Sequence, residues 1–244
     1  MRNIKLTIQY DGTRYSGWQF QKNAKSIQEI IQLAIKKITR QKVCLIGSGR
    51  TDAGVHAKAQ IANFKTNSQI PLKNLQMALN SALPKDIIIS DIEEACPGFS
   101  AQHDARSKLY CYTIVNNDFV NPFIRRFAAK CFYKLDVSSM KRAAKLLIGR
   151  RDFKSFQKKD KKEKNAIRKI RNIKVEKNKD IVYIYIEADG FLYNMARNIV
   201  GTLVDVGRGK ISVKAVKDIL SKKDIRFSGP TMAAKGLCLI KVRY

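Results

Sequence analysis

The chain has 244 residues, enough for one large domain or two small ones, and 45% of them are apolar, which is enough to fill a core. Its 48 lysines and arginines against 20 aspartates and glutamates give a formal charge of +28, so its surface field favours a polyanionic partner, with nucleic acid as the first candidate. No run of about 18 apolar residues occurs, which excludes a membrane-spanning helix.

The first half of the chain predicts six elements. In chain order they are a strand over 4–10, a helix over 27–39, strands over 42–46 and 58–65, a helix opened by Pro71, and a strand over 87–92. The first helix has a capping box, because Ser26 precedes it and Glu29 follows three residues later. The order βαββαβ is that of a ferredoxin-like unit.

The second half predicts the same order without repeating the sequence. Its elements are strands over 108–115, 168–176, 181–188 and 237–243, helices over 138–148, 191–206 and 213–222, and extra strand material over 127–133. We therefore expect an α+β fold of two βαββαβ halves, 1–98 and 99–244, with a largely antiparallel sheet and helices packed on one side. The basic stretch 157–165 is predicted to be a solvated loop.

Cysteine and histidine spacing argues against metal and redox sites. Five cysteines lie at least fifteen residues apart, so no CxxC motif exists, and His56 and His103 lack ligand-spaced partners. The N-terminus "MRNIKLTIQY" alternates like a strand and is unlike a signal peptide. We expect reduced thiols and a cytoplasmic location.

The polar loop "GSGRTDAGVH", residues 47–56, lies between two predicted strands and has three interpretations. It is a hairpin turn whose glycines supply positive φ, a phosphate-binding loop, or a catalytic loop. The phosphate interpretation is the weakest, because no GK[ST] follows and the next element is a strand instead of a helix. The sequence alone leaves the plain turn and the catalytic loop open.

The chemistry in this loop centres on one carboxylate, Asp52. Gly49 and Gly54 flank it and allow a ligand or another backbone to approach closely. A strongly positive environment favours the ionised carboxylate, which can act as a base or as a nucleophile toward an electrophilic carbon. No second carboxylate, Cys–His pair or metal motif lies nearby in sequence, so the mechanism should need one carboxylate only.

The segment "GRTDAGVHA" resembles the signature of the pseudouridine synthases of the TruA family, which isomerise uridines in transfer RNA. The resemblance extends in family order over the whole chain. It includes the blocks "YDGTRYSGWQFQ", "SIQEIIQLAI", "SAQHDARSKLYCYTI", "FLYNMARNIVGTLVDVGRGK" and "SGPTMAAKGLCLIKVRY". Departures from the family pattern are small and lie outside the catalytic set, at 151–153 and 232–233.

The resemblance implies a reaction that breaks the N1–C1′ bond of uridine, turns the uracil and rejoins it through C5, without cofactor or metal. Asp52 matches the nucleophile, with attack at C1′, attack at C6 and glycal formation left open. Tyr110 matches the tyrosine that stacks on the target base, although an apolar strand also suits a core aromatic, as Tyr112 does. Arg197 matches the arginine that pairs with the aspartate, and Arg50 the one that fills the space of the flipped base.

The resemblance also implies the partners. Family members are homodimers, and their targets are uridines at positions 38, 39 and 40 of the tRNA anticodon stem-loop. Three alternatives remain on the residues alone. They are the same chemistry on another RNA, a non-catalytic basic RNA-binding protein, and an NTP-dependent RNA enzyme, against which the absence of GK[ST] argues.

Overall fold

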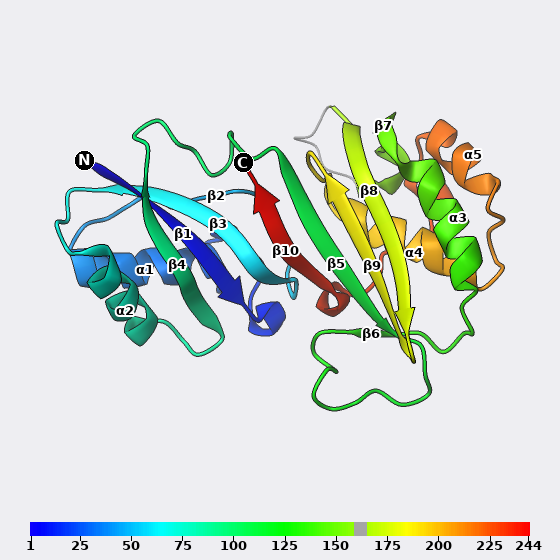
Figure 1. The fold of residues 1–244 in the computed structure, drawn as a ribbon, viewed down its shortest axis with the longest axis horizontal. Coiled ribbons are helices and arrows are strands. Elements are labelled where there is room, and N and C mark those ends of the chain that lie inside the picture. Colours follow the sequence, from blue (N-terminus) through cyan, green and yellow to red (C-terminus); the bar gives the residue numbers. More distant parts are fainter. Residues whose placement is uncertain (159–164) are drawn as a thin grey trace. The chain divides into compact units, whose positions relative to one another are not determined.

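The computed structural model describes residues 1–158 and 165–244, so most of the predicted solvated loop 157–165 lies outside the described residues. The chain forms two compact units (Figure 1). Unit 1 comprises residues 1–106 and 239–244, and unit 2 comprises 107–238. No described helix is long and apolar enough to cross a membrane.

Unit 1 has the predicted βαββαβ order. Its elements are β1 (Arg2–Tyr10), α1 (Ile27–Thr39), β2 (Ile46–Gly47), β3 (His56–Thr66), α2 (Leu72–Ala82) and β4 (Ile87–Ala95), with a short 3-10 helix at Gly12–Arg14. The strand order is β4-β1-β3, β2 also pairs with β3, and all these pairings are antiparallel. The last strand, β10 (Leu237–Arg243), follows β3 in this order.

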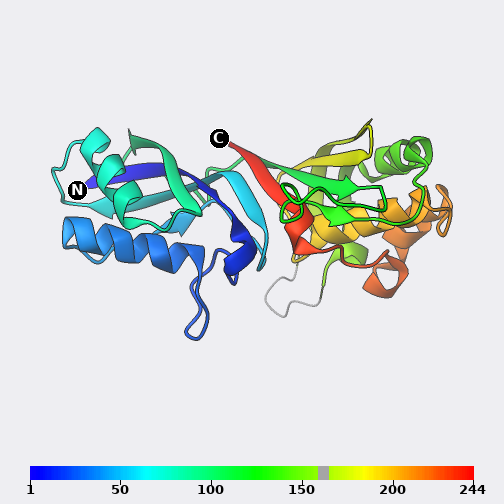
Figure 2. The ribbon, with the colours of Figure 1, turned by 90° about the horizontal axis from the view of Figure 1, so that it is seen from below.

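Helix α1 occupies the predicted residues, and its sequence explains both its start and its buried face. The Ser26 Oγ accepts the Glu29 backbone N–H at 3.3 Å, which satisfies a donor of the first turn. Ile27, Ile31 and Ile35 recur at helical spacing and are fully buried. Figure 2 shows α1 running along one face of the unit 1 strands, while α2 packs against β4 and α1.

The strand predicted over 42–46 was wrong for most of its length, because β2 comprises only Ile46 and Gly47. Helix α1 supplies the partners that a neighbouring strand would have given. The Gln28 Nε2 donates to the Leu45 carbonyl at 2.7 Å, and the Gln32 Nε2 donates to the Val43 carbonyl at 2.8 Å. Side-chain amides of α1 therefore supply the hydrogen bonds that these backbone carbonyls would otherwise accept from a neighbouring strand.

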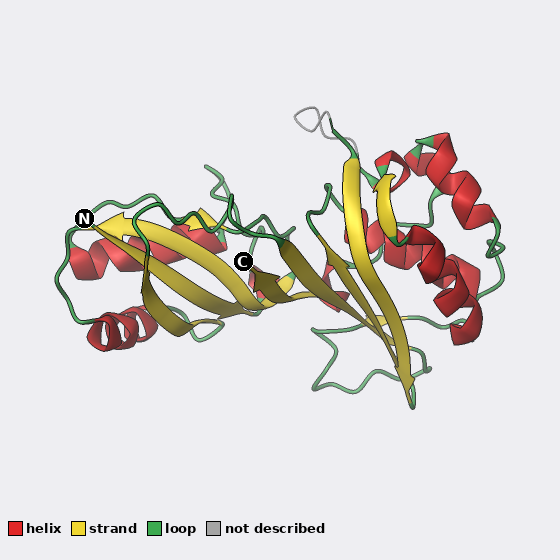
Figure 3. Ribbon diagram, turned by 45° about the horizontal axis from the view of Figure 1, so that its top comes forward, coloured by secondary structure: helices red, strands yellow, loops and turns green. Residues whose placement is uncertain are grey.

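Unit 2 also mixes an antiparallel sheet with helices. Its strands are β5 (Ser107–Val115), β6 (Ala129–Lys130), β7 (Gly149–Asp152), β8 (Ile167–Asn178) and β9 (Ile181–Ala188), and its helices are α3 (Val137–Leu147), α4 (Met195–Gly207) and α5 (Ala215–Lys222). The pairs β5-β9, β9-β8 and β8-β7 are antiparallel, and β6 pairs in parallel with β5. Figure 3 shows the helices of this unit gathered on one side of its strands. The α+β fold with a mostly antiparallel sheet is confirmed.

Two details of unit 2 differ from the sequence prediction. The long helix begins at Met195 and not at 191, because Asn194 adopts a left-handed conformation with φ of 59° and interrupts the helical path. Strand β7 was not predicted, since its four residues carry no alternating pattern. Helix α3 ends as expected beside Gly149, whose φ is 108°.

The compact units differ from the predicted halves 1–98 and 99–244 at both ends. The boundary falls after Arg106, whose backbone N–H donates to the Arg243 carbonyl at 2.8 Å, and residues 239–244 group with unit 1. The halves describe the order of elements along the chain. They remain a proposal about how the sequence divides.

Candidate active site

The catalytic loop predicted from sequence is the connection between β2 and β3 in unit 1. Asp52 lies half-buried within it, and the Val55 backbone N–H donates to the Asp52 carbonyl at 3.1 Å. Gly54 has a φ of 77°, a conformation that glycine adopts without strain. Asp52 is therefore held at a tight turn closed by its own backbone.

Hydrogen bonds from the segment 10–18 hold this loop in place on both sides of Asp52. The Tyr10 hydroxyl and Thr51 Oγ1 form a buried hydrogen bond of 2.8 Å. The backbone N–H of Trp18 donates to the Thr51 carbonyl at 3.1 Å. On the other side, the Gly54 N–H donates to the Tyr15 carbonyl at 3.3 Å. The backbone around Asp52 is thus fixed before any ligand binds.

Two glycines of that segment permit the backbones to touch. A Cβ on Gly12 would lie 2.0 Å from the Val55 carbonyl oxygen. A Cβ on Gly17 would lie 2.4 Å from the Thr51 carbonyl oxygen, and its φ of 89° is also unfavourable for other residues. Close approach of backbone to backbone is the physical reason for glycine at both positions.

Arg50 is exposed in the same loop, where its Nε donates to Gln19 Oε1 at 3.2 Å. The start of the loop is tied to β3 by Gln60, which accepts from Ser48 Oγ at 2.6 Å and donates to the Gly49 carbonyl at 2.8 Å. The Arg50 side chain therefore extends from an anchored backbone into solvent, close in sequence to Asp52.

The loop ends at His56, which is buried. Its Nδ1 accepts the Gly12 backbone N–H at 3.0 Å and lies 3.2 Å from Asp11 Oδ1. Through this hydrogen bond His56 joins the Gly12 segment to β3. Across residues 1–158 and 165–244, no cluster of three or more histidine, cysteine or acidic side chains could hold a metal ion.

The hydrogen bond between Tyr10 and Thr51 gives a first testable prediction. Tyr10→Phe should lower the free energy of unfolding by about 1 kcal/mol, because it leaves the buried Thr51 hydroxyl without this partner. The double-mutant cycle with Thr51→Val, followed by urea unfolding, measures the coupling. Strict additivity of the two losses would contradict a direct bond.

Tyr110 lies on β5 in unit 2, opposite Ile186 of β9. Its side chain is 6% exposed and packs edge-to-face against Phe191, with ring centroids 4.9 Å apart. Tyr112 is fully buried, as expected for a core aromatic, and donates its hydroxyl to the Ala233 carbonyl at 2.7 Å. Burial raises the pKa of Tyr112 above its ordinary value, so this hydroxyl stays protonated and serves as a donor.

Arg197 is the exception on helix α4. Every other residue from Met195 to Gly207 is buried, whereas Arg197 is half-buried. Its Nε donates to the Met232 carbonyl at 2.6 Å, and the Met232 N–H donates back to the Arg197 carbonyl at 3.4 Å. A backbone carbonyl of unit 2 thus helps to orient the guanidinium, and the pairing of Arg197 with Asp52 stays a prediction.

The segment 228–236 lies directly against α4 and explains that contact. A Cβ on Gly201 would lie 1.8 Å from the Pro230 carbonyl oxygen, so helix and segment touch through backbone. Thr202 Oγ1 accepts the Gly229 N–H at 2.8 Å, and Thr231 donates to Asn198 Oδ1 at 2.6 Å. These contacts fix the Met232 carbonyl and, through it, Arg197.

The predicted site residues fall into two groups. Arg50 and Asp52 share one loop in unit 1, and Tyr110 and Arg197 lie on β5 and α4 of unit 2. Sequence reasoning missed the residues that support the Asp52 loop, namely Tyr10, Gly12, Gly17, Trp18 and Thr51. Thr51 belongs to the quoted loop itself, and the signal for the other four was present in the block "YDGTRYSGW", which is unusually rich in glycine and aromatic residues for a turn.

Comparison with known proteins gives a match over most of the chain. The family model described as tRNA pseudouridine synthase matches residues 6–104 and 143–244. Asp52, Arg50 and Arg197 lie inside the matched ranges, and Tyr110 lies between them.

Three relatives align with this chain over 244 residues, which is 100% of both chains. They are "tRNA pseudouridine synthase A 2" of Clostridium perfringens (strain 13 / Type A) at 49% identity, and "tRNA pseudouridine synthase A" of Thermoanaerobacter sp. (strain X514) at 48% and of Caldicellulosiruptor bescii at 50%. A solved chain of an H/ACA RNP bound to a substrate RNA is 11% identical with a TM-score of 0.42, covering 97% of this chain and 47% of that chain. That last likeness is too low to carry an argument.

Proposed function

The chain belongs to the tRNA pseudouridine synthase family, and from this premise we propose that it converts uridine to pseudouridine at positions 38, 39 and 40 of tRNA. The observation that carries the proposal is the Asp52 loop, which presents one carboxylate from a backbone fixed on both sides. The chain's charge of +28 suits a polyanionic substrate. Neither alternative, another RNA or binding without catalysis, has a specific observation in its favour.

Asp52 is the proposed nucleophile. Its carboxylate attacks the uridine, the N1–C1′ bond breaks, the uracil turns, and a C5–C1′ bond forms while the carboxylate is released. C5 then loses its proton and N1 gains one, so substrate and product have the same composition. A preorganised carboxylate supports this role, because the loop needs no rearrangement when the substrate binds.

Three further side chains have proposed roles. Tyr110 stacks on the target base, which requires the base to leave the helix stack, at a cost of a few kcal/mol. Arg50, exposed beside the nucleophile, takes the space that the flipped base vacates. Arg197 orients and stabilises the charged Asp52 carboxylate, and its bond to the Met232 carbonyl supports a fixed guanidinium.

We further propose that the enzyme acts as a homodimer in the cytoplasm. The scattered spacing of its five cysteines, with no CxxC motif, suits a reducing compartment. Action at three neighbouring positions requires recognition by shape and backbone more than by base edges, and the excess of cationic side chains suits contacts with phosphates.

Release of the C5 proton provides the test. Unmodified tRNA that carries tritium at C5 of uridine should lose tritium to water when incubated with the protein alone, without metal, nucleotide or other cofactor. Substrate labelled at C5 of cytidine serves as the control and should lose none. Folded protein that binds tRNA and releases no tritium would reject the proposed reaction.

A further inference from the structure

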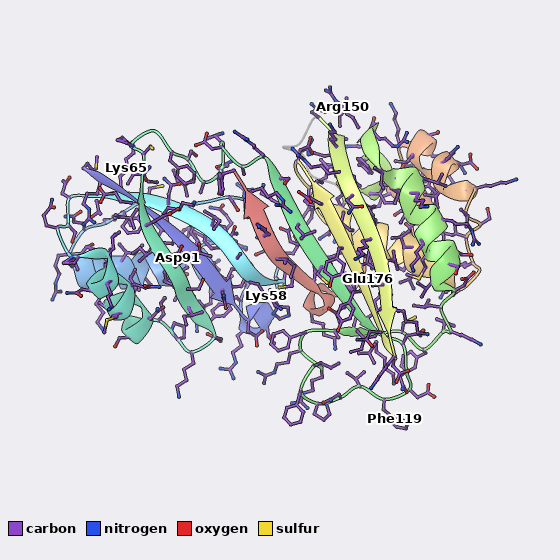
Figure 4. The ribbon with its side chains drawn as sticks, in the orientation of Figure 1. Lys58, Lys65, Asp91, Phe119, Arg150 and Glu176 are labelled. Atoms are coloured by element: carbon purple, nitrogen blue, oxygen red, sulfur yellow. The ribbon has the colours of Figure 1, made fainter. Side chains whose placement is uncertain are left out.

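A loop in unit 2 exposes an unusual number of aromatic rings. We call residues 117–134, which connect β5 to α3 and include β6, the aromatic loop. Thirteen large apolar side chains are exposed among residues 1–158 and 165–244, and five of them lie here: Phe119, Phe123, Phe127, Phe132 and Tyr133. Phe119 is 85% exposed and Phe123 is 90% exposed, and Figure 4 labels Phe119 at the lower edge of the view. Such a concentration of exposed rings marks a binding surface.

The aromatic loop has a defined backbone that presents these rings. At its base, the Asn116 Nδ2 donates to the Tyr133 carbonyl at 2.7 Å and to the Cys131 carbonyl at 3.2 Å. The Asn117 Nδ2 donates to Asp180 Oδ2 at 2.7 Å, which ties the loop to the turn between β8 and β9. Near its tip, Asn121 Oδ1 accepts the Phe123 N–H at 2.9 Å. The aromatic rings therefore project from a backbone that these hydrogen bonds hold in place.

Cationic side chains are interleaved with the rings. The aromatic loop has one acidic residue, Asp118, and four basic ones, Arg125, Arg126, Lys130 and Lys134. Lys130 Nζ lies 4.1 Å from the Phe132 ring centroid, and the Arg208 guanidinium carbon lies 4.7 Å from that of Tyr133. Rings beside cations can accept a base on the ring face and a phosphate on the cation.

We propose that the aromatic loop binds tRNA outside the target uridine, with Phe119 and Phe123 stacking on unpaired bases and the neighbouring cations contacting phosphates. The inference rests on the proposed function and names a docking surface for the same substrate. The loop lies in the stretch between the two ranges that the family model matches.

Charge complementarity favours RNA over a second copy of the chain as the occupant. A two-fold contact through this surface would place the same patch against itself, bringing the four cations of one loop toward the four of the other. The acidic side chains at hand, Asp118 within the loop and Asp180 at its base, are fewer than these cations. A polyanion meets no such repulsion and gains from counterion release.

The test separates ring stacking from apolar contact. In an Asp52→Asn background, which prevents turnover, tRNA binding is measured by fluorescence anisotropy for two double variants. F119L/F123L keeps apolar bulk and loses the rings, so its Kd should rise about tenfold. F119Y/F123Y keeps the rings, so its Kd should stay within about twofold of the parent.

A matched pair of exposed apolar residues in unit 1 provides the control. Leu33 and Met77 are 59% and 65% exposed, and L33A/M77A should leave the Kd unchanged. Retained tRNA affinity in F119L/F123L would overturn the proposal. The proposal would also be overturned if F119L/F123L without RNA sedimented more as a monomer than the parent protein. That result would mean that the loop contacts a second copy of the chain. Wild-type protein that binds tRNA and makes no pseudouridine would instead reject the proposed function, leaving the binding comparison intact.

Discussion

Asp52→Asn should abolish pseudouridine formation, with a single-turnover rate at least about 10⁴-fold below that of the wild type, because an amide cannot replace the carboxylate as the proposed nucleophile. The loop should survive the change. Its turn is closed by the backbone carbonyl of residue 52, and its flanks are held by Thr51 and Gly54. The Kd for tRNA and the unfolding transition should therefore stay close to those of the wild type.

A carboxylate elsewhere in unit 1 controls for the loss of charge. Asp91 is exposed on β4, where Figure 4 labels it, and Asp91→Asn removes the same charge. We expect full activity in this variant. Activity above one per cent of the wild type in Asp52→Asn would mean that another group performs the attack.

Gly12→Ala should disable the enzyme from a position that carries no reactive group. The added methyl would lie 2.0 Å from the Val55 carbonyl oxygen, so the backbone on one side of the Asp52 turn must shift. Such overpacking costs about 1–3 kcal/mol of unfolding free energy. A displacement of Asp52 by about 1 Å should lower kcat about 100-fold.

Gly98→Ala is the matched control, because a Cβ there has no neighbour within 4 Å. It should leave both urea unfolding and kcat unchanged. If Gly12→Ala kept the wild-type kcat despite a measurable loss of stability, the close contact between the two segments would not be what positions Asp52.

Local sequence signals predicted most elements of this fold. Helix α1 occupies 27–39 as expected, because Ser26 caps it and its isoleucines recur at helical spacing. The sequence of helix α4 is apolar nearly all round, and the helix is buried at every position but Arg197. Each of these features depends on residues close together in the chain.

Features that depend on distant residues were not predictable. In the segment 42–46, where a strand was expected, backbone carbonyls accept hydrogen bonds from the side chains of Gln28 and Gln32. These bonds form because α1 packs beside the segment, which the local sequence does not reveal. The orientation of Arg197 depends on the Met232 carbonyl, 35 residues away. Asp52 was predicted from sequence as the candidate nucleophile, while the residues of the segment 10–18 that support its loop are identified only by the contacts between the two segments.

A pseudouridine map of bulk tRNA tests the central claim most directly. Unmodified tRNA is incubated with wild type or Asp52→Asn, with no cofactor added, and pseudouridine is located at nucleotide resolution. We predict new pseudouridine at positions 38, 39 and 40 with the wild type only. Folded wild-type protein that leaves all three positions unmodified, or an Asn variant that modifies them equally well, would contradict the assignment of this reaction to Asp52.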